Sequence, residues 1–216
     1  LMPILTYPFQ AAPRNKIPGK ALETIDVTIR RTVRDIIGLP SSTNNNMFYA
    51  SRKHRGLGVV NANWEVNLQH FAIAKRLSTV QDDLFHRVYN CDQEMVNCKT
   101  ALGVTGDTAR QLRNAKRDEA FNQWTAHPYQ GAGAKHFATF PKGNRWLYDR
   151  KTLSASEWTA AIKLNANYAN LAGVPDHKSQ ASNLCRRCGK ENETPSHVSG
   201  ACSYGNLRQI ARHDAV

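Results

Sequence analysis

The sequence predicts a mainly α-helical protein: a helical bundle and a helical linker, followed by a small cysteine-rich module near the C-terminus. Apolar residues recur three or four positions apart along almost the whole chain, which is the period of an amphipathic helix. Proline, glycine and asparagine separate these runs, as expected between helices. Three of the five cysteines share one short segment with a histidine, and this predicts a module of another kind.

The first long helix is predicted after Pro18-Gly19. Leu39-Pro40 ends it, because the residue before a proline resists helical backbone angles. Its apolar positions follow helical spacing: Leu22, Ile25, Ile29, Val33, Ile36 and Ile37. Basic side chains lie on its other face and in the glycine-containing turn that follows over 52–58: Arg30, Arg31, Arg34, Arg52, Lys53 and Arg55.

Three further helical runs are predicted between residues 61 and 125. Cap-like residues over 61–63 begin the first run, which continues to Leu77. Cys91 and Cys98 share one face of the second run, and we expect them to be packing residues. The third run opens at 107–108 and carries a basic stripe, for which a solvated face and a phosphate-contacting face are both open explanations: Arg110, Arg113, Lys116 and Arg117.

The remaining elements are shorter. Residues 130–134 are rich in glycine but lack the G-x-G-x-x-G spacing, so no nucleotide site is predicted there. Ser154 with Glu157 fits a capping box and predicts a helix to about Ala172. A linker over 173–182 and a short helix over 204–213 complete the chain.

Cys185, Cys188, His197 and Cys202 form the pattern C-x2-C-x8-H-x4-C, the most informative feature of the chain. Three thiolates and an imidazole in two close pairs can close a tetrahedron around Zn²⁺, so we predict a structural zinc site. Catalytic zinc is not expected, because the protein fills all four positions. The alternatives are two buried cysteines or a redox pair, and the redox pair lacks a surrounding βαβ pattern.

The formal charge of +12, from 29 basic and 17 acidic residues, indicates a polyanionic partner, and nucleic acid is the first candidate. The basic surplus is concentrated in residues 1–60 and 108–150, which suggests particular basic faces. No membrane span or signal peptide is visible, and reduced cysteines indicate the cytosol or the nucleus. The chain begins without a methionine, so we expect it to be part of a longer protein.

Asp82-Asp83 resembles the paired carboxylates that bind metal in polymerases. Such pairs follow an apolar strand, whereas these two residues follow a polar segment at a predicted helix start. Acidic residues are favoured there by the helix dipole, so capping is the better interpretation.

Together these features resemble the region after the polymerase palm in reverse transcriptases of site-specific non-LTR retrotransposons, the kind that insert into ribosomal RNA genes. The helix from Leu22 to Leu39-Pro40 looks like the thumb helix. The segment 48–58 resembles the thumb's closing GGLG stretch, with Arg55 in place of the first glycine. The segment 143–147 is similar to the linker, and the cysteine–histidine motif matches the family's zinc knuckle.

The resemblance implies three regions: 1–60 as the end of the reverse transcriptase domain and the thumb start, 61–180 as thumb and linker, and 181–216 as zinc knuckle and short helix. It implies a parent polyprotein that is an RNA-directed DNA polymerase and endonuclease, performing target-primed reverse transcription with Mg²⁺ in domains this sequence lacks. We expect the segment alone to be inactive, because it has no palm aspartate motif or nuclease residues.

We therefore predict a segment that binds element RNA and target DNA, in the nucleus after synthesis in the cytoplasm, with no membrane and no small-molecule substrate. The knuckle would contribute Arg186, Arg187, Arg208 and Arg212 to the arginines and lysine of residues 30–55 named above. Two alternatives remain: a free-standing, non-enzymatic zinc-knuckle nucleic-acid-binding protein, and a zinc-stabilised adaptor for an acidic protein.

Overall fold

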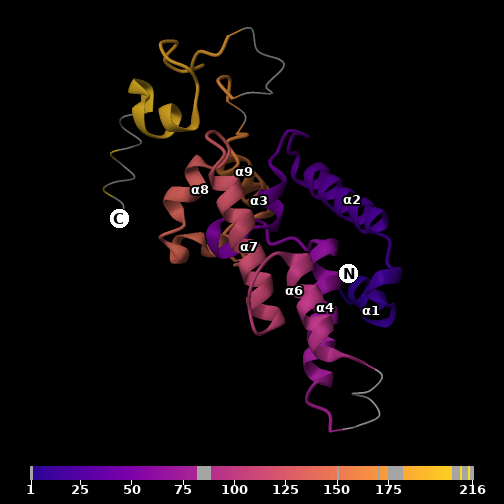
Figure 1. Cartoon of the computed structure of the whole chain (residues 1–216). Helices are drawn as coiled ribbons and strands as arrows, with labels where there is room; N and C mark the ends of the chain where they lie inside the picture. The colour runs from indigo at the N-terminus through magenta and orange to yellow at the C-terminus, as the bar shows by residue number, and fades with distance from the viewer. Residues whose placement is uncertain are drawn as a thin grey trace.

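The computed structural model of the chain describes residues 2–81, 89–149, 151–169, 171–174, 182–205, 210 and 214. These residues form helices and connecting turns, and their strand-like pairing is one antiparallel bridge between Leu184 and Asn192. The mainly α-helical fold is therefore confirmed (Figure 1). The α-helices are α1 (Met2–Ala11), α2 (Gly19–Ile37), α3 (Asn45–Tyr49), α4 (Ala62–Leu77), α6 (Cys91–Leu102), α7 (Ala109–Thr125), α8 (Ala132–Phe137) and α9 (Ala155–Asn165).

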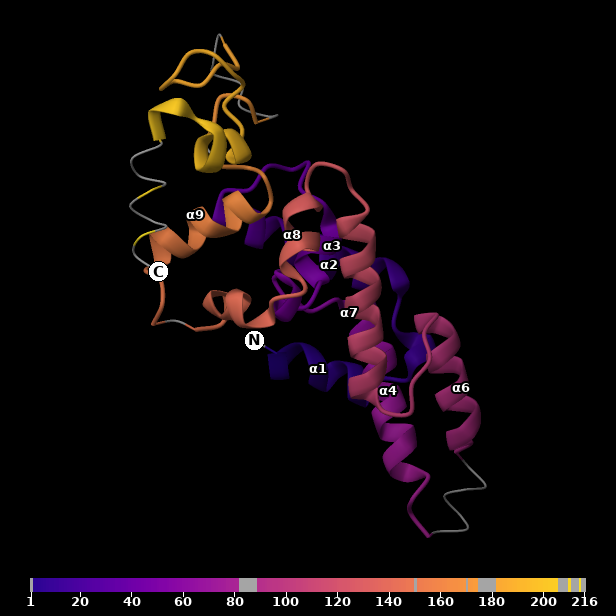
Figure 2. The same ribbon diagram turned by 90° about the vertical axis from the view of Figure 1, so that its left-hand side faces the viewer.

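Short helical turns connect these helices. They are η1 (Arg14–Lys16), η2 (Arg52–His54), η3 (Pro141–Leu147), the π-helical turn η4 (His197–Ala201) and η5 (Ser203–Gly205). The cysteine-rich segment lies at one end of the molecule, and the far ends of α4 and α6 lie at the other (Figures 1 and 2).

The helix ends follow signals that are visible in the sequence. Helix α2 ends at Gly38, whose φ of +69° is in the left-handed region that glycine favours. Asn61 caps α4 by accepting a hydrogen bond from the Trp64 N–H at 2.9 Å. Ser154 and Glu157 form the predicted capping box at the start of α9.

Helices α4 and α6 lie side by side and pack with α7 around a small apolar cluster (Figure 2). Its buried members are Leu68, Phe71, Cys98, Leu102 and Leu112. Cys91 and Cys98 are both buried, as expected of packing residues. Burial raises the pKa of Cys98 to about 12, and the neighbouring Glu94 carboxylate adds to the effect, so this thiol stays protonated.

The largest core joins segments that are far apart in the sequence. It draws on the end of α2, on α3, and on α7, α8, α9 and η3. Phe48 and Trp124 have no exposed surface in it. Burying an aromatic side chain of this size is worth several kcal/mol, so this cluster anchors the fold. Residues from both sides of position 60 contribute to this core. The predicted domain boundary at that position stays a prediction.

The turn after η2 depends on its glycines. Gly56 approaches Ala50 so closely that a Cβ there would lie 2.2 Å from the Ala50 carbonyl oxygen. Gly58 has a φ of +62°. Arg55, which occupies the first glycine position of the resembled GGLG stretch, also has a left-handed backbone, with φ +67°. The backbone conformation thus suits the glycine of that pattern, although an arginine is present.

Two local expectations differ from the structure. Helix α9 ends at Asn165 and not near Ala172, because Asn167 adopts a φ of +58° and its amide donates to the Tyr129 carbonyl. The short helix α8 begins within the glycine-rich stretch and continues to Phe137. The Asn167–Tyr129 contact is long-range and leaves no periodic signal in the sequence.

Several predictions fall outside the described residues. These are Asp82-Asp83, most of the linker, most of the final helix, and the two arginines at positions 208 and 212. Within the described part of the chain, no helix has the length and apolar character needed to cross a membrane.

Candidate metal centre and nucleic-acid interface

Cys185, Cys188, His197 and Cys202 converge in the structure as the sequence predicts. One donor atom from each residue lies within 4.8 Å of every other. The Cys185 and Cys202 sulfur atoms are 3.9 Å apart, and the Cys188 sulfur is 3.3 Å from His197 Nε2. A tetrahedral Zn²⁺ with Zn–S bonds of about 2.3 Å requires sulfur atoms about 3.8 Å apart, so the donor set fits the ion.

A tight loop presents the first two cysteines. The Leu184–Asn192 bridge closes it, and the Cys185 N–H donates to the Glu191 carbonyl at 2.7 Å. Gly189 turns the chain with a φ of +65°. Cys185 and Cys188 therefore sit in the turn of a hairpin-like loop, where two positions three apart can face one point.

The other two ligands come from a short helical turn. Thr194 Oγ1 accepts a hydrogen bond from the His197 N–H at 3.2 Å and so caps the start of that turn. The Cys202 N–H donates to the His197 carbonyl at 2.7 Å, in the wide five-residue spacing of a π-helical turn. This spacing brings His197 and Cys202 to the same side of the turn.

The surroundings of the cluster favour ligand function. His197 Nδ1 lies 3.0 Å from a Glu191 carboxylate oxygen, which leaves Nε2 directed at the thiols. Hydrogen bonds from the backbone N–H groups of Lys190 and Glu191 lower the pKa of Cys188 to about 6. Cys202 differs from Cys188, because burial raises the pKa of its thiol and nearby Cys185 adds to that effect, which disfavours the thiolate in the absence of a cation.

Glu193 is a buried carboxylate that the sequence analysis missed. Its side chain is 5% exposed, and Arg186 Nε donates to both of its oxygens, at 2.8 and 3.0 Å. It also accepts a hydrogen bond from the Ala172 N–H at 2.6 Å. Glu193 therefore ties the cysteine-rich segment to residues 171–174, and Arg186, half exposed, has a structural partner.

The three predicted α2 arginines occupy different environments. Arg30 donates to the Tyr49 hydroxyl. Arg34 donates to the Thr43 carbonyl at 3.1 Å, and its guanidinium lies 4.8 Å from the centre of the Phe48 ring. Arg31 is exposed. Arg30 and Arg34 thus hold α2 against α3, while Arg31 projects from the helix.

The predicted basic turn over 52–58 also contains both packed and exposed basic side chains. Arg55 stacks 3.5 Å from the centre of the Phe137 ring, and its Nε donates to Asn144 Oδ1 at 2.7 Å. Asn144 is fully buried and also donates to the Lys53 carbonyl at 2.7 Å. Arg55 and Asn144 therefore pin the turn to the 137–147 segment. Arg52 and Lys53 remain exposed.

Further basic residues that the structure describes lie in the cysteine loop and on α7. Arg187 and Lys190 are exposed in the cysteine loop. On α7, Arg113 forms an ion pair with the buried Glu65 at 2.8 Å, whereas Arg110 is exposed. No sequence signal separates Arg113 from Arg110, because the buried carboxylate belongs to a different helix.

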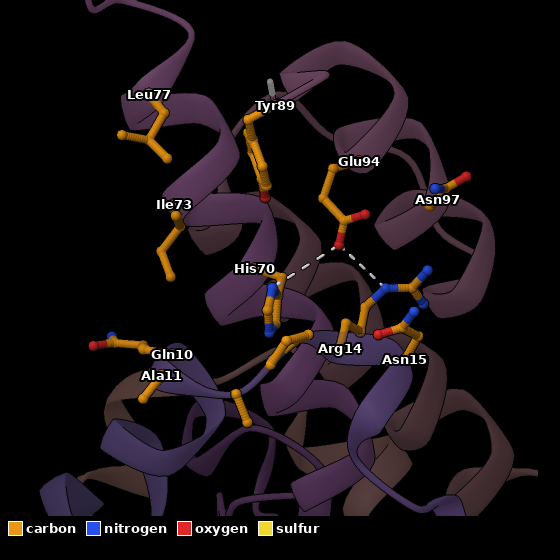
Figure 3. Close-up of a pocket in the computed structure, with 12 residues that line it drawn as sticks. Gln10, Ala11, Arg14, Asn15, His70, Ile73, Leu77, Tyr89, Glu94 and Asn97 are labelled. Atoms are coloured by element: carbon orange, nitrogen blue, oxygen red, sulfur yellow. Dashed lines mark hydrogen bonds and ion pairs between the residues drawn. The ribbon is translucent and has the colours of Figure 1, made fainter. Parts of the chain in front are cut away.

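A hollow of about 470 Å³ opens between the segment after α1 and helices α4 and α6 (Figure 3). Arg14 Nε lies 3.2 Å from Glu94 Oε1, and His70 Nδ1 lies 3.9 Å from the same oxygen. Arg14 also donates to Asn67 at 3.3 Å. Because Glu94 compensates the charge of Arg14, this hollow is a structural junction and a poor site for phosphate.

No protein-family model matches the chain. Two curated proteins similar to it are both described as a retrovirus-related Pol polyprotein from type-1 retrotransposable element R2, and both come from Popillia japonica. One is 23% identical over 202 residues, covering 93% of this chain and 41% of the relative. The other is 22% identical over 225 residues, covering 100% and 46%. The chain is thus similar to R2 Pol polyproteins along nearly its whole length.

The similarity to the R2 polyproteins extends over both the helical part and the cysteine-rich part of the chain. The resemblance to a non-LTR retrotransposon polyprotein, inferred from the thumb-like helix, the turn and the cysteine motif, is thereby confirmed. The chain spans less than half the length of these two relatives.

Proposed function

We propose that this chain is the nucleic-acid-binding thumb, linker and zinc-knuckle part of a retrotransposon Pol polyprotein. In this proposal the parent is an RNA-directed DNA polymerase and endonuclease that performs target-primed reverse transcription. The similarity to two R2 polyproteins along nearly the whole chain supports the parent's identity. The convergence of four metal-binding side chains in a chain of formal charge +12 carries the assignment of this segment to nucleic-acid binding.

The role of the cysteine–histidine cluster is structural. Cys185, Cys188, His197 and Cys202 would hold Zn²⁺, which supplies a rigid crosslink between the hairpin-like loop and the π-helical turn. All four tetrahedral positions are protein ligands, so no position remains for a reacting water. The crosslink would display Arg187 and Lys190 on a fixed loop, toward element RNA or target DNA.

The helical part would add phosphate contacts. Arg31 and Lys53 are exposed, and the other two α2 arginines, which pack on α3, are half exposed. Contacts of this kind position a nucleic acid without reading its sequence and weaken as salt rises. We assign polymerisation, cleavage and Mg²⁺ binding to other parts of the parent, and we place the complex in the nucleus.

Fluorescence anisotropy with labelled RNA and DNA tests this function. The zinc-loaded protein should bind both, and the logarithm of the binding constant should fall linearly with the logarithm of salt between about 50 and 200 mM. In a parallel assay it should neither extend a primer nor cut DNA. Failure to bind any nucleic acid at low salt would overturn the proposal and favour an adaptor for an acidic protein.

A further inference from the structure

Two hollows adjoin on the surface formed by α2, α7, η2, η3 and α9. One is apolar and encloses about 500 Å³; the other is basic and encloses about 520 Å³. Arg52 and Tyr148 line both of them, so the two hollows are neighbours that meet at these side chains. A ligand that fills both would place an apolar, flat group beside an anionic group.

The apolar hollow is lined by aromatic side chains, two of which also pack against the main core. Trp146 and Trp158 line it from η3 and α9, and neither ring is fully buried. Ile36 is 75% exposed and Tyr148 is 50% exposed, which is a large apolar exposure for neighbours on one surface. Asp149 is a carboxylate in this lining, and it pairs with Arg145 at 3.5 Å.

The basic hollow is lined by Ser51, Arg52, Lys53, Gly58, Arg117 and Tyr148, a described lining without a carboxylate. Arg52 uses Nε to donate to the Leu57 carbonyl at 3.0 Å, which fixes its guanidinium at the edge of the hollow. Burial lowers the pKa of Arg117, and Arg113 and Arg52 lower it further, while the Glu65 carboxylate acts in the opposite direction. Crowded guanidinium groups of this kind favour an oxyanion, because an anion relieves their mutual repulsion.

Two nearby acidic groups each have a partner outside the lining of the basic hollow. Glu65 pairs with Arg113 at 2.8 Å, and Asp118 lies 3.7 Å from His54 Nδ1. Arg117 is therefore the α7 cation that faces the basic hollow while its neighbour Arg113 is compensated.

We propose that the adjoining hollows form a binding site for single-stranded nucleic acid, in which an unpaired base lies against Tyr148, Trp146 and Trp158 and the adjacent phosphate contacts Arg52 and Arg117. This inference rests on the proposed nucleic-acid-binding function and locates one strand on the molecule. A duplex is a poorer occupant, because its bases are already stacked on each other and cannot enter the apolar hollow. The combination of aromatic faces with a basic groove is the chemistry that single strands require.

Binding of labelled oligothymidylate and oligouridylate of about ten nucleotides, compared with a duplex of the same length, tests the site. Tyr148→Ala should weaken single-strand binding by about five- to 150-fold and leave duplex binding unchanged. Arg52→Gln/Arg117→Gln should weaken it as well and reduce the magnitude of the single-strand salt slope by about 1.4. Comparing the two oligonucleotides shows whether the strand is DNA or RNA.

Lys75→Gln/Arg76→Gln is the matched control. It also removes two positive charges, from the exposed end of α4, which lies away from α9 and opposite the cysteine-rich segment (Figure 1). This control variant should change the binding of single strands and of duplex by the same factor. Arg52→Lys/Arg117→Lys keeps both charges and should retain most of the salt slope. Circular dichroism of the glutamine and lysine double variants shows whether any loss of binding comes from unfolding.

The outcomes separate the two proposals. If the wild-type protein binds nucleic acid but Tyr148→Ala and the arginine variants bind single strands as the wild type does, this site is overturned and the proposed function stands. Equal losses for duplex and single strand would identify a duplex phosphate contact and overturn the single-strand site. Absence of any nucleic-acid binding by the wild type overturns both.

Discussion

The helical body, residues 2–169, and the cysteine-rich module, residues 182–205, are stabilised in different ways. The body contains three clusters of buried apolar residues. In the described module, the buried residues are the ligands Cys185, His197 and Cys202 together with Glu193 and Gly205. The large apolar side chains at its two ends, Leu184 and Tyr204, are 44% and 74% exposed.

This difference shows where each region obtains its stability. Burial of apolar surface is sufficient for a body of this size, but a segment of the module's length cannot form a core of its own. In the module, the proposed metal crosslink and the contact between Arg186 and the buried Glu193 carboxylate would take the place of that core. Perturbations of the metal should therefore act on the module, and perturbations of packing should act on the body.

The largest effect should follow removal of a ligand. Cys185→Ser should lower the zinc content well below one equivalent and abolish hydrogen-exchange protection over residues 182–205, because structural zinc contributes about 10–16 kcal/mol to folding of such sites. The helices of the body should keep their protection. Metal analysis and hydrogen exchange measure both quantities.

Cys91→Ser is the control for that experiment, since Cys91 is buried in the body. It should leave about one equivalent of zinc. A zinc content that is unchanged by Cys185→Ser, or unfolding of both regions together, would contradict the separation.

A core truncation should produce the opposite pattern. Trp124, on α7, is a fully buried member of the main cluster, so Trp124→Ala should destabilise the body by about 3–5 kcal/mol in urea unfolding. Zinc content in the absence of urea should remain at about one equivalent. Loss of zinc from this variant under conditions where its body is folded would show that the regions depend on each other.

A smaller effect is expected at the contact between the regions. The Glu193 carboxylate binds Arg186 and the Ala172 N–H, and Glu193→Gln keeps the shape but removes the charge. At pH 7 this should cost about 1–3 kcal/mol of local stability and speed amide exchange at residues 172 and 173. Glu23→Gln, at an exposed position of α2, is the control. Unchanged exchange in both variants would show that the ion pair does not join the regions.

The smallest effects should distinguish the α2 arginines. Arg34→Gln loses contacts with the 43–45 loop and with Phe48, so we expect about 1 kcal/mol of destabilisation. Arg31→Gln removes an exposed side chain and should change stability by less than about 0.5 kcal/mol. If Arg31 contacts a duplex phosphate, its loss lowers the magnitude of the duplex salt slope by about 0.9. Equal destabilisation by the two variants would remove the distinction between packing and binding arginines.

Local features of the amino-acid sequence were sufficient for much of this description. Periodicity located α2, α4, α7 and α9, and capping residues such as Asn61 and Ser154 marked their starts, because these signals depend on neighbours within four residues. The spacing of Cys185, Cys188, His197 and Cys202 predicted their convergence, since two short chelating pairs leave few geometries. The relationship to retrotransposon polyproteins was also visible in these motifs.

The partners of several polar side chains could not be predicted from the sequence, because they come from distant segments. Arg30, Arg34 and Arg31 look alike along the helix, yet the first two pack on α3 and the third does not. Glu193 accepts a hydrogen bond from the Ala172 N–H, 21 positions away in the sequence. Asn144 donates to the Lys53 carbonyl, 91 positions away. The meeting of Arg52 with Arg117 and Tyr148 likewise joins three separate segments. Such contacts depend on how helices pack, and helix packing is set by the summed burial of many side chains rather than by any local pattern.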